Sequence, residues 1–359
     1  PLMSPDVAGK AFAAFVERRR AEFRALGIRW HTEDRVREAR WLFEASEDYI
    51  GPLTASAFVG FCKRNLLIQT EGRMAPFVPN SSQRLFLRKV LDDGACKGLP
   101  VRQLVLKARQ MGFSTCIQAL KSVICSRPNT HGTTIAHKQE ATDNLRNMMV
   151  TYLTEGPFYP RLARRKMKVL EMDRPARSHL RYETAEDKNA GRSANNLFLH
   201  LSESAFWKHP STEIGLLQTV QDVPGTFIFR ETTANGMGGP FYDAYQRAKS
   251  GKGGLTEALF FAWWTHARYR TPLTRAQAST VMGALDADES EGVDLYGWTP
   301  EQVAWRRIQI ADKLGGDVDK FKQEYPSNDV EAFIAQGSPV FNLRQVQSRM
   351  ELAARWDEP

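Results

Sequence analysis

The sequence predicts an α/β protein with a mostly parallel sheet that helices cover on both faces. Between residues 101 and 265, short apolar runs of strand length alternate with segments of helical pattern, and such alternation is typical of parallel sheets. The strand-like runs are 101–106, 132–136, 178–183, 196–201, 225–231 and 256–262. With 359 residues and 42% hydrophobic content, the chain is long enough to bury one large core or two.

Helical patterns flank this central part on both sides. Residues before 67 contain charged, amphipathic runs, a helix is expected over 84–90, and the polar segment after 265 includes an acidic run at 286–291. We therefore divide the chain into a helical region 1–66, a core 67–265, a helical lid or linker 266–342 and the start of a linker helix 343–359.

Composition narrows the classes of function. A net charge of +8 favours a polyanionic partner without establishing one. No apolar run approaches the roughly 18 residues that a membrane helix needs, and the first residues lack the pattern of a signal peptide. Four cysteines without metal-binding spacing predict reduced thiols in a cytoplasmic protein.

The segment Lys107–Thr115 follows the first strand-like run and leads into a helix. Backbone N–H groups at such a loop and helix N-terminus attract anions, and Ser114 or Thr115 stands where the hydroxyl of a P-loop holds Mg²⁺. The usual pattern has a lysine before that hydroxyl, whereas this chain has Phe113. Taken alone, a turn that only caps a helix explains these residues equally well.

A second polar site follows the run 196–201, where Ser202 and Glu203 end an apolar strand. A carboxylate at such a strand end can polarise the attacking water of an ATPase. The usual aspartate before the glutamate is replaced by Ser202, whose hydroxyl can reach a Mg²⁺-bound water but brings no charge. The alternative is that Glu203 is an exposed acid at a strand end.

A third polar site follows the next strand, which ends in Thr232-Thr233-Ala234-Asn235-Gly236. Hydroxyl and amide groups there can sense a γ-phosphate and move a loop when it leaves, although Asn235-Gly236 by itself is an ordinary turn. All three sites lie at the carboxyl ends of strands, where open α/β sheets bind ligands. Chance could produce one such site, but three of them in this order along the chain are much less easily explained by chance.

These residues resemble the large (motor) subunit of tailed-phage terminases, over about residues 61–342. The most specific parts are 107–115, 200–207, 231–239 and 331–341. The resemblance implies a P-loop NTPase of the ASCE type (additional strand, catalytic glutamate) with a helical N-terminal extension and a small lid subdomain. It also implies ATP and Mg²⁺ as cofactors and ATP hydrolysis as the activity.

The resemblance also suggests individual roles. Arg109, or with less support Lys107, would replace the missing lysine, Gln83 would read adenine, Glu203 would be the catalytic carboxylate, and 233–235 would couple hydrolysis to movement. The predicted site comprises catalytic Glu203, Arg192 and Asn235; nucleotide-binding Gln83, Lys107, Arg109, Gln110, Met111, Gly112, Phe113, Ser114, Thr115 and Thr233; and metal-binding Ser114 and Ser202.

Arg192 lies in a loop eleven residues before Glu203. In a ring motor, an arginine at such a place resembles the finger that neutralises phosphoryl charge on a neighbour's nucleotide. A surface arginine beside a glycine is an equally weighted alternative. The basic stretch 161–181 could likewise track a DNA backbone, although a solvated charged face is the more favoured interpretation.

The resemblance implies double-stranded DNA, the portal protein of a procapsid, the terminase small subunit and a homo-oligomeric ring as partners, in the cytoplasm of an infected bacterium. Family members continue into a nuclease with clustered acids, and no such cluster follows residue 342, so we expect no nuclease activity from this chain. Two alternatives remain: a helicase or translocase ATPase of another family, and a non-catalytic DNA-binding assembly module with a degenerate nucleotide fold.

Overall fold

The computed structural model describes residues 53–334 apart from 71, 128–129, 156–161, 174–176 and 192–194, together with Glu17 and Ala21. The predicted helical runs before residue 53 and the predicted linker after 342 lie outside the described residues. Within the described part of the chain, no helix is both long enough and apolar enough to cross a membrane.

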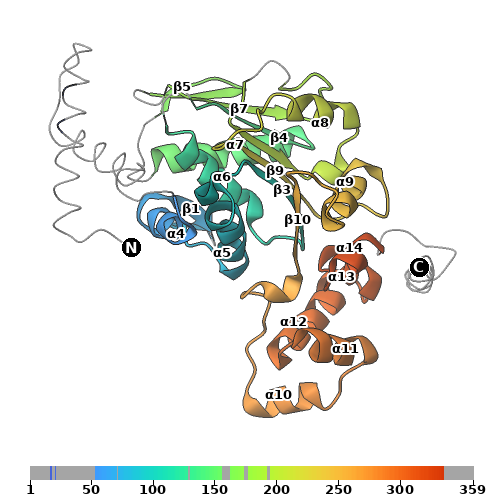
Figure 1. Ribbon diagram of the computed structural model, residues 1–359. Coiled ribbons are helices and arrows are strands. Elements are labelled where there is room, and N and C mark those ends of the chain that lie inside the picture. The colour runs from blue at the N-terminus through green and yellow to red at the C-terminus, as the bar shows by residue number, and fades with distance from the viewer. Residues whose placement is uncertain are drawn as a thin grey trace. The chain divides into compact units, whose positions relative to one another are not determined.

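An eight-stranded sheet forms the centre of the fold (Figure 1). Its spatial order is β10-β3-β9-β8-β4-β7-β6-β5. The bounds are β3 Val101–Lys107, β4 Gly132–Ala136, β5 Leu162–Arg165, β6 Val169–Met172, β7 His179–Thr184, β8 Phe198–Ser202, β9 Phe227–Thr232 and β10 Glu257–Phe261. The pairs β7–β4, β4–β8 and β8–β9 are parallel, whereas β5, β6 and β7 are joined antiparallel.

The six predicted strands are all present, and their alternation with helices confirms the predicted α/β class. Strands β9 and β8 lie between β3 and β4 in the order of the sheet. The sequence analysis missed the antiparallel edge strands β5 and β6 and the small hairpin of β1 Leu67–Thr70 and β2 Arg73–Pro76. Each of these missed strands is four residues long and contains no more than two consecutive apolar residues, so no long apolar run marks it.

The chain separates into two compact units, which are described in turn. Of the described residues, the first unit contains those within 53–103 and 112–231, and the second contains those within 104–111 and 232–334. The predicted boundaries at 66, 265 and 342 stay predictions.

The helices of the first unit are α4 Ala55–Asn65, α5 Ser81–Leu87, α6 Phe113–Ile124, α7 Gln139–Thr154 and α8 Pro210–Leu217. The predicted helix over 84–90 starts earlier than expected, at Ser81, because Asn80 and Gln83 form a reciprocal capping box there. A π-helical turn, Arg88–Asp92, extends it at the other end.

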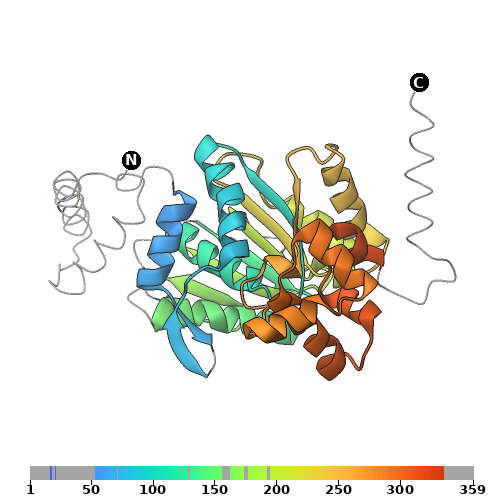
Figure 2. The same cartoon turned by 90° about the horizontal axis from the view of Figure 1, so that it is seen from below.

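Helices cover the two faces of this sheet differently. Helices α6 and α7 pack together against β4, β7 and β8, while α8 packs on the opposite face (Figures 1 and 2). Along β8, Leu199 and Leu201 join the apolar core under α8, whereas His200 and Ser202 make polar contacts on the α6 side. The strand is therefore buried on both faces, but only one face is purely apolar.

The second unit is mostly helical. It holds α9 Gly239–Lys249, α10 Arg275–Met282, α11 Ala287–Tyr296, α12 Pro300–Ile308, α13 Val318–Glu324 and α14 Asp329–Ile334. Its core is centred on the fully buried Trp263, whose ring lies 4.9 Å from Trp298 and 5.6 Å from Phe321. Gly292 lets Trp298 approach, because a Cβ at residue 292 would lie 2.2 Å from the indole ring.

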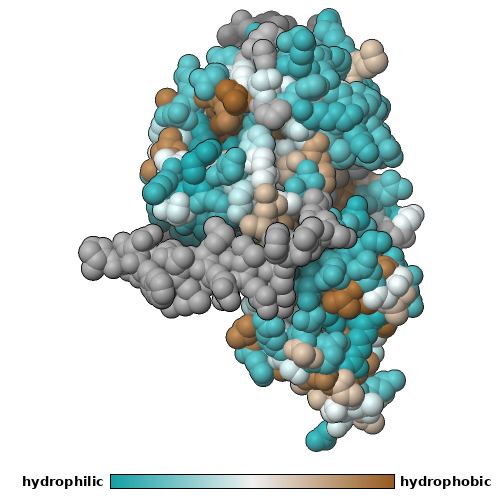
Figure 3. All heavy atoms as spheres, turned by 90° about the vertical axis from the view of Figure 1, so that its right-hand side faces the viewer, coloured by the Kyte–Doolittle hydropathy of each residue, from teal (hydrophilic) through white to brown (hydrophobic). Residues whose placement is uncertain are grey.

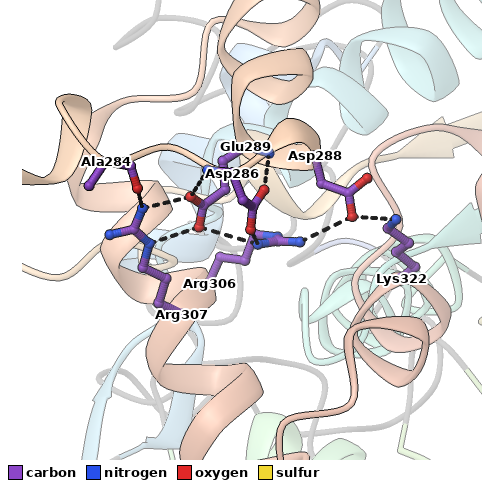
Figure 4. A network of polar contacts seen from close by, with 7 residues as sticks. All are labelled: Ala284, Asp286, Asp288, Glu289, Arg306, Arg307 and Lys322. Carbon is purple, nitrogen blue, oxygen red and sulfur yellow. Dashed lines mark hydrogen bonds and ion pairs between the residues drawn. The ribbon is translucent and has the colours of Figure 1, made fainter.

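A buried ion-pair network joins α11, α12 and α13 in this unit (Figure 4). Arg306 is only 3% exposed and lies 3.3 Å from Glu289 and 3.6 Å from Asp288. Arg307 also holds Glu289, at 2.6 Å. Burial raises the pKa of Glu289, but the hydrogen bonds and charge of Arg307 outweigh burial and leave that pKa below its ordinary value. Arg306 and Glu289 are both buried and each has more than one partner of opposite charge, and the loss of one partner from such a buried group is destabilising.

The face drawn in Figure 3 is mostly hydrophilic, and the hydrophobic residues on it stand in small separate groups. Scattered exposed apolar side chains of this kind are normal on a protein surface. We therefore attach no docking function to them.

Candidate functional site

The loop after β3 turns into α6 at Gly112, the N-cap of that helix, which has a φ of 74°. A left-handed backbone of this kind favours glycine. The Gln83 Nε2 group donates a hydrogen bond of 2.6 Å to the Gly112 carbonyl, and a Cβ at residue 112 would lie 2.7 Å from that nitrogen. Gln83 therefore holds the turn at Gly112 in place. Its Oε1 accepts a hydrogen bond of 2.8 Å from the Asn80 N–H. Its predicted role in reading adenine stays a prediction.

Phe113, at the position of the usual P-loop lysine, is a core residue. Its side chain is 1% exposed and meets the ring of Phe86 edge-on at 5.5 Å. Only its backbone is therefore available to an anion, and its side chain brings no positive charge to the loop.

Three oxygen-bearing side chains meet at the start of α6. The Ser114 hydroxyl donates to Glu231 Oε1 at 2.6 Å, and the Ser202 hydroxyl donates to the same oxygen at 2.8 Å. The meeting follows from the sheet, because the register of β8 and β9 pairs Ser202 with Glu231. The two predicted metal-binding hydroxyls are thus brought together around a carboxylate.

Glu203 directly follows β8 and has φ 51° and ψ 46°. This left-handed conformation is uncommon for a residue with a side chain and is found preferentially at functional sites. Its backbone N–H donates to the Glu231 carbonyl at 2.7 Å, so the ends of β8 and β9 together hold the turn that carries its carboxylate.

A layer of buried polar groups lies behind these residues, between the sheet and α6. Gln118 Nε2 lies 2.7 Å from His200 Nδ1, and His200 Nε2 lies 3.4 Å from Glu231 Oε1. Because an amide nitrogen only donates, the contact with Gln118 places the imidazole proton on Nε2, facing Glu231. Gln118 also accepts from the Tyr182 hydroxyl at 2.8 Å, which fixes the amide and, through it, the ring of His200.

The second unit holds the first half of the loop. Lys107 is buried at 6% exposure, whereas the side chain of Arg109 is 59% exposed and forms an ion pair of 3.0 Å with Glu324. The Arg109 N–H also donates to the Glu324 carbonyl at 2.9 Å. Gln110 is exposed with a φ of 55°, and Met111 is buried. Arg109 is thus the predicted loop cation with the more accessible charge.

The predicted coupling residues follow β9 in the second unit. Thr233 is half-buried and Asn235 is exposed, and the Thr232 hydroxyl donates to the Thr233 carbonyl at 2.6 Å. In the first unit, the Thr115 carbonyl accepts a hydrogen bond of 3.1 Å from the Tyr152 hydroxyl, which connects the start of α6 to α7. The coupling role of Thr233 and Asn235 stays a prediction.

Arg192 lies outside the described residues, so its predicted role as a finger stays a prediction. Part of the basic stretch 161–181 is described: Arg164, Arg165, Lys166 and Lys168 are exposed on and after β5. Glu171 partly balances them, at 3.9 Å from Arg164 and 2.5 Å from Lys166.

Among the described residues, no group of three or more His, Cys, Asp or Glu side chains is placed to hold a metal ion. The oxygens of Ser114, Ser202 and Glu231 nevertheless form a donor set that suits Mg²⁺, which prefers oxygen ligands and is usually held by one or two carboxylates together with substrate phosphates. The residues present therefore fit a magnesium–nucleotide complex.

No family model and no curated protein matches this sequence. Solved structures do. The large terminase of bacteriophage HK97 matches 82% of this chain with a TM-score of 0.51 and 14% identity. This chain has the fold of a phage large terminase.

Other matches are to a mutant of the large terminase ATPase domain of Thermus phage P74-26, with a TM-score of 0.46, 16% identity and coverage of 70% of this chain and 94% of that one. The large terminase of the thermophilic bacteriophage D6E, solved with ADP, matches 51% of this chain and 46% of that one, with a TM-score of 0.39 and 12% identity. The present chain spans 58% of the length of the HK97 terminase. The predicted resemblance and the predicted P-loop NTPase fold class are thereby confirmed at the level of fold.

The candidate site also contains two residues that the sequence did not predict, Glu231 and His200. Both lie inside segments that had been singled out, but Glu231 was treated as part of a strand and His200 as an apolar-strand residue. The signal was an acid next to the last residue of β9, and only the register of β8 with β9 shows that it is paired with Ser202.

Lys121, three residues beyond Gln118 on α6, gives a test of the buried polar layer. Its ammonium is fully buried, 2.8 Å from the Thr134 hydroxyl and 4.3 Å from the centre of the Tyr182 ring. Burial lowers the pKa of Lys121 to about 7. The unfolded chain binds this proton up to the ordinary pKa of 10.5, so the unfolded state binds more protons above pH 7 and the free energy of unfolding rises there.

We expect Lys121→Met to remove this rise. The difference in unfolding free energy between wild type and variant should change by about 2 kcal/mol from pH 7 to about pH 9 in denaturant titrations. Taking the difference cancels the titration of groups that do not interact with Lys121. Lys138→Met, at an exposed lysine, is the control. Parallel curves for wild type and Lys121→Met would show that Lys121 titrates normally.

Proposed function

We propose that this chain is the ATP-hydrolysing motor domain of a phage terminase large subunit, which drives double-stranded DNA into a procapsid. The observation that carries the proposal is the meeting of the α6 N-terminus with Ser114, Ser202, Glu203 and Glu231 at neighbouring strand ends. The terminase fold supports it, and Ser202 and Glu231 lie near the carboxyl ends of β8 and β9, where open α/β sheets bind ligands.

In this proposal each part of the site has one task. The backbone N–H groups at the start of α6 bind the phosphates, and Ser114 and Ser202 hold Mg²⁺, which neutralises charge on the β- and γ-phosphates when bound. Glu203 accepts a proton from the water that attacks the γ-phosphate. Thr233 and Asn235 sense the loss of that phosphate, and Arg192 acts on a neighbour's nucleotide.

The proposed partners are double-stranded DNA, the portal protein, the terminase small subunit and further copies of this chain in a ring, within the cytoplasm of an infected bacterium. The net charge of +8 and the exposed basic residues around β5 support a polyanionic partner. The expected lack of nuclease activity stays a prediction.

A phosphate-release assay with ATP and Mg²⁺, with and without double-stranded DNA, tests the proposal. Release of phosphate that depends on nucleotide and on Mg²⁺ supports the motor. Nucleotide binding without any hydrolysis, even in assembled rings on procapsids, would favour the non-catalytic module instead. Strand separation of a duplex would favour a helicase.

A prediction concerns Arg109, the proposed positive charge of the loop after β3. Arg109→Ala should weaken ATP affinity about 10–100-fold, because a hydrogen bond to a charged group is worth about 1.5–3 kcal/mol. Lys107→Ala should weaken it less and mainly lower the melting temperature, since Lys107 is buried. Equilibrium titration with ATP and thermal unfolding of both variants check this. If Lys107→Ala loses more affinity while its melting temperature is unchanged, the assignment is reversed.

A further inference from the structure

The magnesium site of this chain lacks an acid at the position where P-loop ATPases usually have one. That position, the last residue of β8, is Ser202, and a hydroxyl brings no charge. Mg²⁺ bound with a nucleotide is usually held by at least one carboxylate besides the phosphates. The charge therefore has to come from another element.

The carboxylate nearest to the two hydroxyls belongs to β9. Glu231 Oε1 accepts from Ser114 at 2.6 Å and from Ser202 at 2.8 Å, so one oxygen of Glu231 lies at the point where both hydroxyls meet. Glu231 and Ser202 face each other across the parallel pair β8–β9. A carboxylate at residue 231 can thus reach the place that an aspartate at residue 202 would occupy.

A supporting shell holds the carboxylate in place. His200 Nε2 faces Glu231 Oε1 at 3.4 Å, and Gln118 fixes the His200 ring through a contact of 2.7 Å. Shells of this kind orient metal ligands, and their loss weakens metal binding. Both supporting residues are fully buried, so the arrangement is built into the fold.

We propose that Glu231 supplies the carboxylate charge of the magnesium site, in place of the acid missing at residue 202, with Ser114 and Ser202 as its hydroxyl companions. This inference rests on the proposed nucleotide-binding function. It assigns to β9, rather than to β8, the acidic residue that makes nucleotide binding depend on Mg²⁺.

The test is the gain in ADP affinity that Mg²⁺ produces, measured by calorimetry in Mg²⁺ and in EDTA. Glu231→Gln keeps the shape and an acceptor oxygen but removes the charge. It should reduce the gain about 10–100-fold, while affinity in EDTA stays the same or rises because a negative charge near the phosphates is lost. Glu140→Gln, at an exposed glutamate on α7, is the control and should keep the full gain.

Moving the carboxylate from residue 231 to residue 202 makes the test more specific. Ser202→Asp combined with Glu231→Gln returns the acid to the usual position and should restore the Mg²⁺-dependent gain. Ser202→Asp alone places two carboxylates in contact and should lower the melting temperature. If Glu231→Gln does not fold, the double variant decides, and a folded double variant without the gain overturns the inference.

Two results distinguish a failure of the proposed function from a failure of the role of Glu231. Wild type that binds no ADP in either condition would overturn the proposed function. Wild type with a clear gain, and Glu231→Gln with the same gain and an unchanged melting temperature, would overturn only the role of Glu231.

Discussion

Replacing Glu203 with glutamine should leave ATP affinity close to that of the wild type and slow hydrolysis about 10²–10⁴-fold. The amide keeps the size of the side chain but cannot accept the proton of the attacking water. The left-handed backbone at Glu203, held by its 2.7 Å hydrogen bond to the Glu231 carbonyl, stays in place because it does not depend on the carboxylate. We therefore expect the substitution to slow hydrolysis without weakening the binding of ATP.

Equilibrium titration with ATP and steady-state phosphate release, measured on the same preparation, check this expectation. Glu140→Gln, at an exposed glutamate, controls for the loss of one acidic charge. Near-normal turnover by Glu203→Gln would remove Glu203 from the catalytic role and leave it as an acid at a strand end.

Arg192→Ala should leave the nucleotide affinity of the isolated chain nearly intact and reduce hydrolysis by the assembled motor on a procapsid about 10³–10⁵-fold. The reason is that a finger supplied by a neighbour touches that neighbour's nucleotide and not its own. Arg275→Ala, at an exposed arginine on α10, is the matched control and should keep normal hydrolysis.

Mixed rings make the Arg192 prediction specific. Arg192→Ala subunits mixed with Glu203→Gln subunits should recover hydrolysis, because some interfaces then pair an intact Glu203 with an intact Arg192 from the neighbour. A finger acting within its own subunit gives no such recovery. Rings shown to contain both variants but lacking recovery would contradict the assignment.

The sequence predicted the centre of the fold well, because the strands β3, β4, β7, β8, β9 and β10 are apolar runs between helical segments. It failed at the edge, where β5 reads Leu-Ala-Arg-Arg and offers no apolar alternation. It also misplaced the start of α5, because the capping box of Asn80 with Gln83 was not recognised.

Only part of the candidate site could be predicted from the sequence. Ser114, Ser202 and Glu203 follow from motifs along the chain, but Glu231 and His200 enter only through the register of neighbouring strands. Register depends on long-range packing, which one sequence does not show. Phe113 illustrates the same point, since only its packing against Phe86 shows that it belongs to the core.

The edge strand β5 has a consequence for the behaviour of the protein in solution. An outermost strand offers unpaired backbone groups to any other strand, and sheets of separate molecules can join there into aggregates. Here Arg164 and Arg165 are exposed on that strand, and Lys166 and Lys168 follow it. Like charges facing each other repel edge-to-edge pairing, so many copies can crowd together without their sheets fusing.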